Sequence, residues 1–182
     1  MKDSAEVMKD YTAAELLEAR EKRVERIQRL WEEYKAPLLV VRVNYPGLRK
    51  TNSVTIKMSE DTSRLISSHF RGRICVQVQE LGAEGPVFYM VLKEDAAALK
   101  LFAVEFEENH PLGRCLDLDV YTIDGQSISR QELGFPRRKC YLCDEDAHLC
   151  VRSGRHGEQE VINYIEKRFR DYCSCLQGMG ME

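Results

Sequence analysis

Length, composition and charge narrow the class of protein. The chain has 182 residues, of which 43% are hydrophobic and 31% charged, a profile typical of a folded globular protein with one domain. Its formal net charge of −3 excludes a chain that binds nucleic acid or anionic membranes through overall charge, so any basic surface must be local. We therefore expect one domain over 1–182, with an ordered core at about 12–172, a flexible tail at 174–182, and neither nucleic acid nor membrane as a partner.

The N-terminal sequence and the cysteine content indicate a compartment. Residues 1–6 lack the basic and then apolar layout of a signal peptide, and no apolar stretch approaches the ~20 residues needed to span a bilayer. Seven cysteines are an odd number, which without a secretion signal favours reduced thiols or metal ligands. We expect a cytoplasmic protein.

Helix and strand patterns alternate along the first half of the chain. Apolar residues recur at steps of three, four and seven before Pro37, and a β-branched run follows it. The patterns predict, in chain order, a helix over 12–34, a strand over 38–43, a helix from Asn52 or Ser53 to about Phe70, and strands over 74–80 and 87–93 joined by a glycine-containing turn.

The second half begins with an ambiguous element. Asp95 can cap a helix that carries Leu99 and Phe106, but the alternation of apolar residues with glutamates near Phe106 also suits a strand. The patterns that follow are a strand over 115–123, a turn at Asp124-Gly125, a returning strand over 126–130, a linker over 131–139, helices over about 143–153 and 158–172, and a fraying end at 178–182. Together they predict an α+β domain with a mixed or antiparallel sheet flanked by helices and a helical C-terminal part.

Two aspartates share one face of a predicted strand. Because side chains alternate along a strand, Asp117 and Asp119 point to one face, about 6.5–7 Å apart at the backbone, while Leu118 points to the other. Such a pair can bind one hard cation such as Mg²⁺, as in phosphoryl-transfer sites, or it can be a solvated strand face. Gly113 would permit close backbone approach to a ligand, and Arg114 supplies a cation for phosphate.

Basic side chains and cysteines gather after the acidic pair. Two basic groups could surround one polyanion, or simply be solvated: Arg137-Arg138-Lys139, and Arg152, Arg155 and His156. The spacing C-x2-C-x6-C-x5-H of Cys140, Cys143, Cys150 and His156 suits a structural Zn²⁺ site. Cys143, Ala147 and Cys150 also lie at helical steps, so we favour buried free thiols that pack a helix, with zinc as the alternative and a redox pair third.

In order along the chain, these motifs resemble the holo-citrate lyase synthases, which are apo-citrate lyase phosphoribosyl-dephospho-CoA transferases. The resemblance covers most of residues 14–170. It rests on Arg20, Arg23, Pro37-Leu38, Pro46-Gly47, His110-Pro111-Leu112-Gly113-Arg114, Asp117-Leu118-Asp119-Val120, Ser129-Arg130, the run from Pro136 to Cys143, Ala147, Cys150, Arg152 and His156. Cys115 departs from the family pattern, where a bulkier aliphatic residue is more usual, but it should face away from the carboxylates.

The resemblance implies a nucleotidyltransferase-like reaction. A helix-flanked sheet that carries Asp-x-Asp on one strand also looks like the nucleotidyltransferase fold. The donor would be 2′-(5″-triphosphoribosyl)-3′-dephospho-CoA, the acceptor a serine of the acyl-carrier (gamma) subunit of citrate lyase, and the by-product pyrophosphate. Asp117 and Asp119 would hold Mg²⁺. Arginines would neutralise the triphosphate: Arg114, Arg137 and Arg138 first, then Arg20, Arg23 and Arg152 with His156.

Two other functions compete with this expectation. One is a different metal-dependent nucleotidyltransferase that modifies a protein hydroxyl. The other is a non-catalytic zinc-binding interaction module built on the cysteine cluster, in which the acidic pair has no role.

Overall fold

The structure, a computed structural model, describes residues 10–179. In this range the chain forms one five-stranded sheet in the order β2-β3-β1-β4-β5, with every neighbouring pair antiparallel. The strands are β1 (Leu38–Val43), β2 (Ile74–Gly82), β3 (Gly85–Leu92), β4 (Leu116–Tyr121) and β5 (Ser127–Ile128). The α+β class is confirmed, and the sheet is antiparallel rather than mixed.

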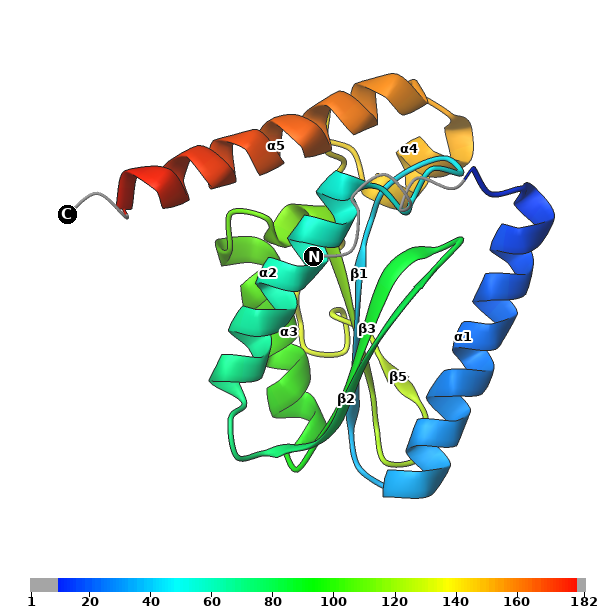
Figure 1. Ribbon diagram of the computed structural model, residues 1–182, viewed down its shortest axis with the longest axis vertical. Helices are drawn as coiled ribbons and strands as arrows, with labels where there is room; N and C mark the ends of the chain where they lie inside the picture. The colour runs from blue at the N-terminus through cyan, green and yellow to red at the C-terminus, as the bar shows by residue number, and fades with distance from the viewer. Residues whose placement is uncertain (1–9, 180–182) are drawn as a thin grey trace.

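Helices cover both faces of this sheet. The described residues form α1 (Ala13–Tyr34), α2 (Ser53–His69), α3 (Ala96–Asn109), α4 (Ala147–Ser153) and α5 (Glu158–Met179), with a short 3-10 helix, η1 (Gly113–Cys115). Figure 1 shows α2 and α3 on one side of the sheet, α1 on the other, and α5 across the top. The larger core, with Leu39 and Leu118, lies under α2, α3 and α5, and a smaller one, with Val40 and Tyr89, lies under α1.

Local capping explains where three of the helices begin. The Thr12 hydroxyl and the Asn52 amide oxygen each accept a hydrogen bond from the backbone three residues on, in a capping box. The Asp95 carboxylate accepts from the Ala98 N–H at 2.9 Å. This cap resolves the ambiguity after Asp95 in favour of a helix.

Side chains of α3 satisfy the outer edge of β4. The short β5 pairs only with Val120 and Tyr121, so the backbone of Leu118 has no strand partner on that side. Its N–H donates to Glu107 Oε1 at 2.9 Å, and its carbonyl accepts from Lys100 Nζ at 3.1 Å. Both side chains are buried. The helix α3 therefore fixes the position of β4, the strand that carries the acidic pair.

The C-terminal part differs from the prediction in three places. The predicted helix over 143–153 begins only at Ala147, because the preceding residues form a turn. The last helix runs to Met179 and is longer than the predicted 158–172. The returning strand covers two of the five residues predicted. Residues 1–9 and 180–182, with the N-terminal sequence and part of the expected tail, lie outside the described residues.

No helix within residues 10–179 has both the length and the hydropathy required to cross a membrane.

Candidate active site

The acidic pair lies on the α1 side of the sheet. Burial alternates along β4, with Leu116, Leu118 and Val120 buried in the larger core and the aspartates between them partly exposed. The predicted division of faces is therefore confirmed. The side chains of Asp117 and Asp119 are 37% and 30% exposed, so both are open to a ligand.

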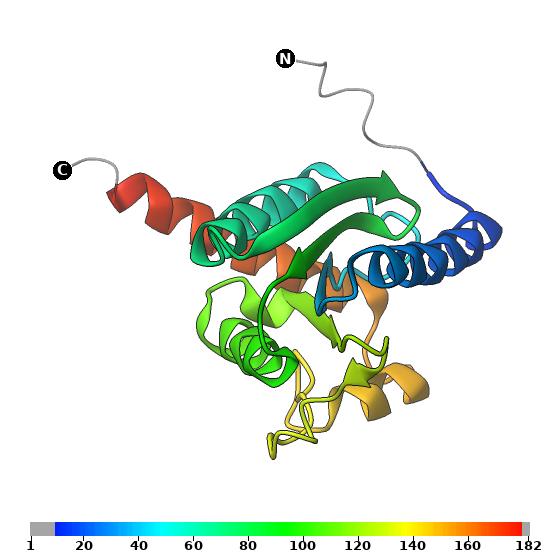
Figure 2. The same cartoon turned by 90° about the horizontal axis from the view of Figure 1, so that it is seen from below.

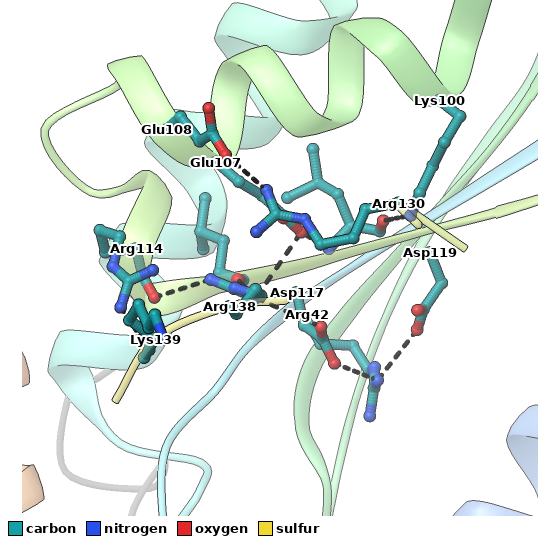
Figure 3. A network of polar contacts seen from close by, with 12 residues as sticks. Arg42, Lys100, Glu107, Glu108, Arg114, Asp117, Asp119, Arg130, Arg138 and Lys139 are labelled. Atoms are coloured by element: carbon teal, nitrogen blue, oxygen red, sulfur yellow. Dashed lines mark hydrogen bonds and ion pairs between the residues drawn. The ribbon is translucent and has the colours of Figure 1, made fainter. Parts of the chain in front are cut away.

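Arg42 of β1 joins the two carboxylates. The strand register places Arg42 directly opposite Asp117. Its Nη2 donates to Asp117 Oδ2 at 2.6 Å and to Asp119 Oδ2 at 2.9 Å, as Figure 3 shows. Two carboxylates thus converge on one positively charged nitrogen, which relieves the repulsion that an isolated pair would have.

Burial and like charge act on the protonation of Asp119. Burial raises the pKa of the Asp119 carboxyl, and the nearby charge of Asp117 raises it further, whereas Arg42 lowers it in part. Asp119 therefore holds a proton more readily than an ordinary aspartate does.

A buried glutamate extends the charged network towards α1. Glu84, in the turn between β2 and β3, lies 2.9 Å from Arg23 Nε, 3.8 Å from Arg20 Nε and 3.9 Å from Arg42 Nη1. A cavity of about 120 Å³ opens here. Its lining combines basic groups with two carboxylates: Arg20, Arg42, Val43, Asn44, Lys50, Glu84 and Asp117.

Lys50 is a further cation of this cavity. Its ammonium donates to the backbone oxygen of Tyr45, and burial, with help from Arg20 and Arg42, lowers its pKa. The three basic residues outnumber the carboxylates of Glu84 and Asp117, so the lining of this small cavity has a net positive charge.

Arg138 contacts the acidic pair near the start of β4. Its two terminal nitrogens donate to Leu116 O at 2.9 Å and Arg114 O at 3.0 Å, and Nη1 lies 3.5 Å from Asp117 Oδ1. Arg138 is thus held by backbone oxygens while its charge faces Asp117. Arg138 thus fixes the end of the linker over 131–139 against β4 (Figure 3).

Arg114 and Gly113 perform structural tasks beside the pair. Arg114 Nη2 donates to Lys139 O at 2.6 Å. It therefore holds the residue that follows Arg138. A Cβ on Gly113 would lie 2.2 Å from the carbonyl oxygen of Phe106 and 2.6 Å from that of Glu107. The close approach expected at Gly113 is therefore to the end of α3, whereas the sequence suggested an approach to a ligand.

A larger cavity, of about 390 Å³, shares Asp117 with the small one. It lies between the start of β4 and the segment that carries α4 and the first turns of α5. Carbon-rich side chains form much of its lining, which includes Asn44, Pro46, Asp117, Arg138, Cys140, Tyr141, Cys150, Val151, His156 and Val161. Asp117 therefore stands at the junction of a cationic cavity and a roomier, more apolar one.

The cysteine cluster borders this larger cavity. The ligand atoms of Cys140, Cys143, Cys150 and His156 all lie within 4.8 Å of one another. Burial raises the pKa of Cys150, and although burial also opposes the thiolate of Cys140, backbone N–H groups of Leu142 and Cys143 lower the pKa of that thiol overall. Such a group could bind a metal such as zinc.

Other predicted binding residues lie further from the carboxylates. Arg137 is exposed, with Nη1 3.3 Å from His148 Nε2, and Arg152 is exposed in the last turn of α4. His156 Nε2 lies 3.3 Å from Cys143 Sγ, within the cysteine cluster. The structure thus gathers Arg20 and Arg23 around Glu84, and groups His156 with the cysteines.

Sequence reasoning missed Arg42, Lys50 and Glu84. A signal for Arg42 existed, because it is a single charge within the apolar run Leu38–Val43. Glu84 lies in a turn and Lys50 in a loop, and their convergence depends on contacts between distant segments.

The donor set of the acidic pair fits a hard divalent cation. Mg²⁺ prefers carboxylate oxygens, and the oxygens of Asp117 and Asp119 already face one positive charge. A bound cation would share these carboxylates with Arg42.

The chain is similar in sequence to the members of a known protein family. The sequence profile of the family described as apo-citrate lyase phosphoribosyl-dephospho-CoA transferase matches residues 11–172. A protein of Vibrio cholerae serotype O1, named "Probable apo-citrate lyase phosphoribosyl-dephospho-CoA transferase", is 35% identical over 167 residues, which cover 88% of this chain and 93% of the relative.

Proteins from Escherichia coli O7:K1 and Shigella boydii serotype 18, both named apo-citrate lyase phosphoribosyl-dephospho-CoA transferase, are each 32% identical. Each match covers 88% of this chain and 90% of the relative. The chain therefore belongs to the apo-citrate lyase phosphoribosyl-dephospho-CoA transferase family, whose members are transferases.

Proposed function

We propose that this protein attaches the phosphoribosyl-dephospho-CoA prosthetic group to a serine of the acyl-carrier (gamma) subunit of citrate lyase. The donor is 2′-(5″-triphosphoribosyl)-3′-dephospho-CoA, and pyrophosphate is released. The observation that carries the proposal is the position of Asp117, which lines both the cationic cavity and the larger, more apolar one. Family membership supplies the class of donor and acceptor.

The two cavities suit the two ends of this donor. The triphosphate carries several negative charges and would lie in the cavity with Arg20, Arg42 and Lys50. The bulkier dephospho-CoA part would extend into the cavity with Tyr141 and Val161. The phosphorus nearest the ribose would then lie beside Asp117, where the two cavities meet.

The reaction exchanges one phosphorus–oxygen bond for another. The carrier serine Oγ forms a bond to the phosphorus nearest the ribose, the bond from that phosphorus to the bridging oxygen breaks, and pyrophosphate leaves with the bond electrons. The hydroxyl proton passes to a carboxylate of the acidic pair, Asp117 or Asp119. Arg42 and Lys50 offset charge that grows on the phosphate oxygens.

Asp117 and Asp119 are the residues that would hold Mg²⁺. Mg²⁺ held there would neutralise charge on the triphosphate. The protein's own contribution is positioning: Arg42 orients both carboxylates, and Arg138 holds the segment that walls the larger cavity.

Mass spectrometry of the carrier subunit tests the proposal. Purified apo-carrier is incubated with this protein, the donor and Mg²⁺, and the mass of the prosthetic group should appear on one serine. Asp117→Asn should abolish the shift while circular dichroism stays unchanged. Asp124→Asn, a matched change at an exposed aspartate in the β4–β5 turn, should retain it. An unmodified carrier with the wild-type protein contradicts the proposal.

Two outcomes would contradict parts of the proposal. Modification with ATP but not with the triphosphoribosyl donor would indicate a different nucleotidyltransferase. Activity that survives both Asp117→Asn and Asp119→Asn would remove the acidic pair from the chemistry. A purely zinc-binding interaction module is disfavoured because the family is one of transferases.

A further inference from the structure

The segment over 131–160 has almost no core of its own. From residue 131 to residue 160, Cys150 is the one buried residue, and all others are partly or fully exposed. Leu149 and Val151 of α4 are among the exposed large apolar side chains. Thirty residues with a single buried side chain bury too little apolar surface to be held in one conformation by the hydrophobic effect alone. The hydrogen bonds of Arg114 and Arg138 hold residues 138–139 of this segment, and the remainder needs a further stabilising interaction.

The cysteine cluster lies at the centre of that segment. Cys143 Sγ is 3.4 Å from Cys150 Sγ and 3.3 Å from His156 Nε2, and all four ligand atoms lie within 4.8 Å of one another. In a tetrahedral site with Zn–S of about 2.3 Å and Zn–N of about 2.0 Å, neighbouring ligand atoms are about 3.5–3.8 Å apart. The observed separations bracket that range.

The turn that contains Cys140 and Cys143 has a conformation suited to metal binding. Cys140 N–H donates to Glu145 O at 2.8 Å and Ala147 N–H to Arg138 O at 2.9 Å, which closes a small hairpin. At its tip the Leu142 N–H points at Cys140 Sγ at 3.5 Å, a contact that favours the thiolate. The thiolate is the form of cysteine that binds a metal.

The geometry removes the main argument for free thiols. That argument placed Cys143 and Cys150 on one face of a helix, but α4 begins at Ala147, so Cys143 lies on the hairpin. A disulfide would involve two of the three sulfurs and would not account for the position of the third thiol or of His156. A metal uses all four groups.

We propose that Cys140, Cys143, Cys150 and His156 bind one zinc ion as a closed structural site. Three thiolates and one imidazole complete a tetrahedron, so no position is left for substrate or catalytic water. The zinc ties the hairpin, α4 and the loop before α5 together. Part of its binding free energy is the folding free energy of this segment.

The proposed zinc site is coupled to the reaction site through Arg138. Arg138 precedes the first ligand, Cys140, by two residues and lies 3.5 Å from Asp117 Oδ1. Arg114 holds the same stretch through Lys139 O. Cys140, Cys150 and His156 also line the larger cavity. The ion therefore supports one wall of that cavity without contact with the reacting groups.

Metal content of the full chain tests the proposal without any activity assay. Protein purified under reducing conditions, without a metal-affinity step, should contain about one zinc per chain by inductively coupled plasma mass spectrometry. Cys143→Ser and His156→Ala should lose most of it. Cys175→Ser, at an exposed cysteine of α5, should keep it. Asp117→Asn should also keep it, which separates this test from that of the proposed function.

A conservative variant guards against loss of metal through misfolding. His156→Cys replaces an imidazole by a thiolate and should retain zinc, because a four-thiolate site is equally tetrahedral. Cobalt substitution of the wild-type chain should give thiolate-to-cobalt charge-transfer absorption, and Cys150→Ser should lower it. Absence of stoichiometric metal both after purification and after addition of Zn²⁺ to the reduced chain would overturn the proposal. So would an unchanged zinc content in Cys143→Ser.

Discussion

Arg42 is the residue on which the acidic pair depends. A single guanidinium bonds to both carboxylates and approaches Glu84 at 3.9 Å, while its own Nε is buried without a hydrogen-bond partner among the described residues. An arginine placed between several acids both orients them and offsets their repulsion. In the proposed reaction it would also face the triphosphate, so its contacts are expected to change when donor binds.

Removal of the guanidinium should expose this dependence. Arg42→Met leaves two adjacent carboxylates without their shared partner, and we expect about 1–3 kcal/mol of lost unfolding free energy at pH 7. The loss should shrink as the pH falls and the carboxylates become protonated. Urea denaturation at several pH values measures it. Arg29→Met, at an exposed arginine of α1, is the control and should change little.

The raised pKa of Asp119 predicts how the unfolding free energy of Asp119→Asn differs from wild type as the pH changes. The folded state binds this proton more tightly than the unfolded chain does, so ionised Asp119 costs stability as the pH rises from about 3.9 through its raised folded value. Asp119→Asn removes that cost. Relative to wild type, the variant should gain unfolding free energy between pH 4 and pH 7, even though it should not transfer the prosthetic group. A difference that stays constant over this range would show that the pKa is not raised.

At the residue scale, the sequence predicts the common face of the two aspartates but not their contact with Arg42. Strand alternation is a local property, so the common face of Asp117 and Asp119 follows from their spacing. Arg42 is 75 residues away from Asp117 in the chain and meets it through the register of β1 and β4. No local pattern encodes that register.

At the scale of elements, the contact between α3 and β4 positions the site. Glu107 and Lys100 satisfy the backbone of Leu118, and η1 packs its glycine against the last turn of the helix. A shift between these elements would move the acidic pair relative to Arg42. The packing of α3 against β4 therefore determines where the acidic pair lies relative to Arg42.

Gly113→Ala tests that close packing. The new Cβ would meet two backbone carbonyl oxygens, which cannot rotate away as a flexible side chain could. We expect about 1–3 kcal/mol of destabilisation, measured by urea denaturation, together with reduced transfer. Gly82→Ala is the matched control, because a Cβ there meets nothing within 4 Å. Equal stabilities of the two variants would contradict the packing argument.

Elements with local start signals were predicted well, and those set by tertiary contacts were not. The caps at Thr12, Asn52 and Asp95 are short sequence signals, and the helices begin there. The start of α4 was misplaced because Cys143 and its neighbours have helical spacing but form a hairpin around Cys140. The strand order of the sheet also depends on long-range pairing, so only its class could be predicted.

At the scale of the whole molecule, the chain combines a sheet scaffold with a thinly packed segment. The sheet and α1 supply the carboxylates and most of the cations, and the segment over 131–160 supplies a wall of the larger cavity. Figure 2 shows α4 beside the β4–β5 end of the sheet, away from α2. Under the zinc proposal, a chelator should loosen this segment and leave the main sheet folded, as hydrogen exchange of the two parts would measure.

In the proposed reaction the acidic pair, with its cations, transfers a prosthetic group to a carrier serine. The most direct measurement is the intact mass of apo-carrier after incubation with donor and Mg²⁺, compared for wild type, Asp117→Asn and Asp124→Asn. We predict the full mass shift with wild type and Asp124→Asn, and an unmodified carrier with a folded Asp117→Asn protein. A full shift with Asp117→Asn, or none with wild type, would contradict it.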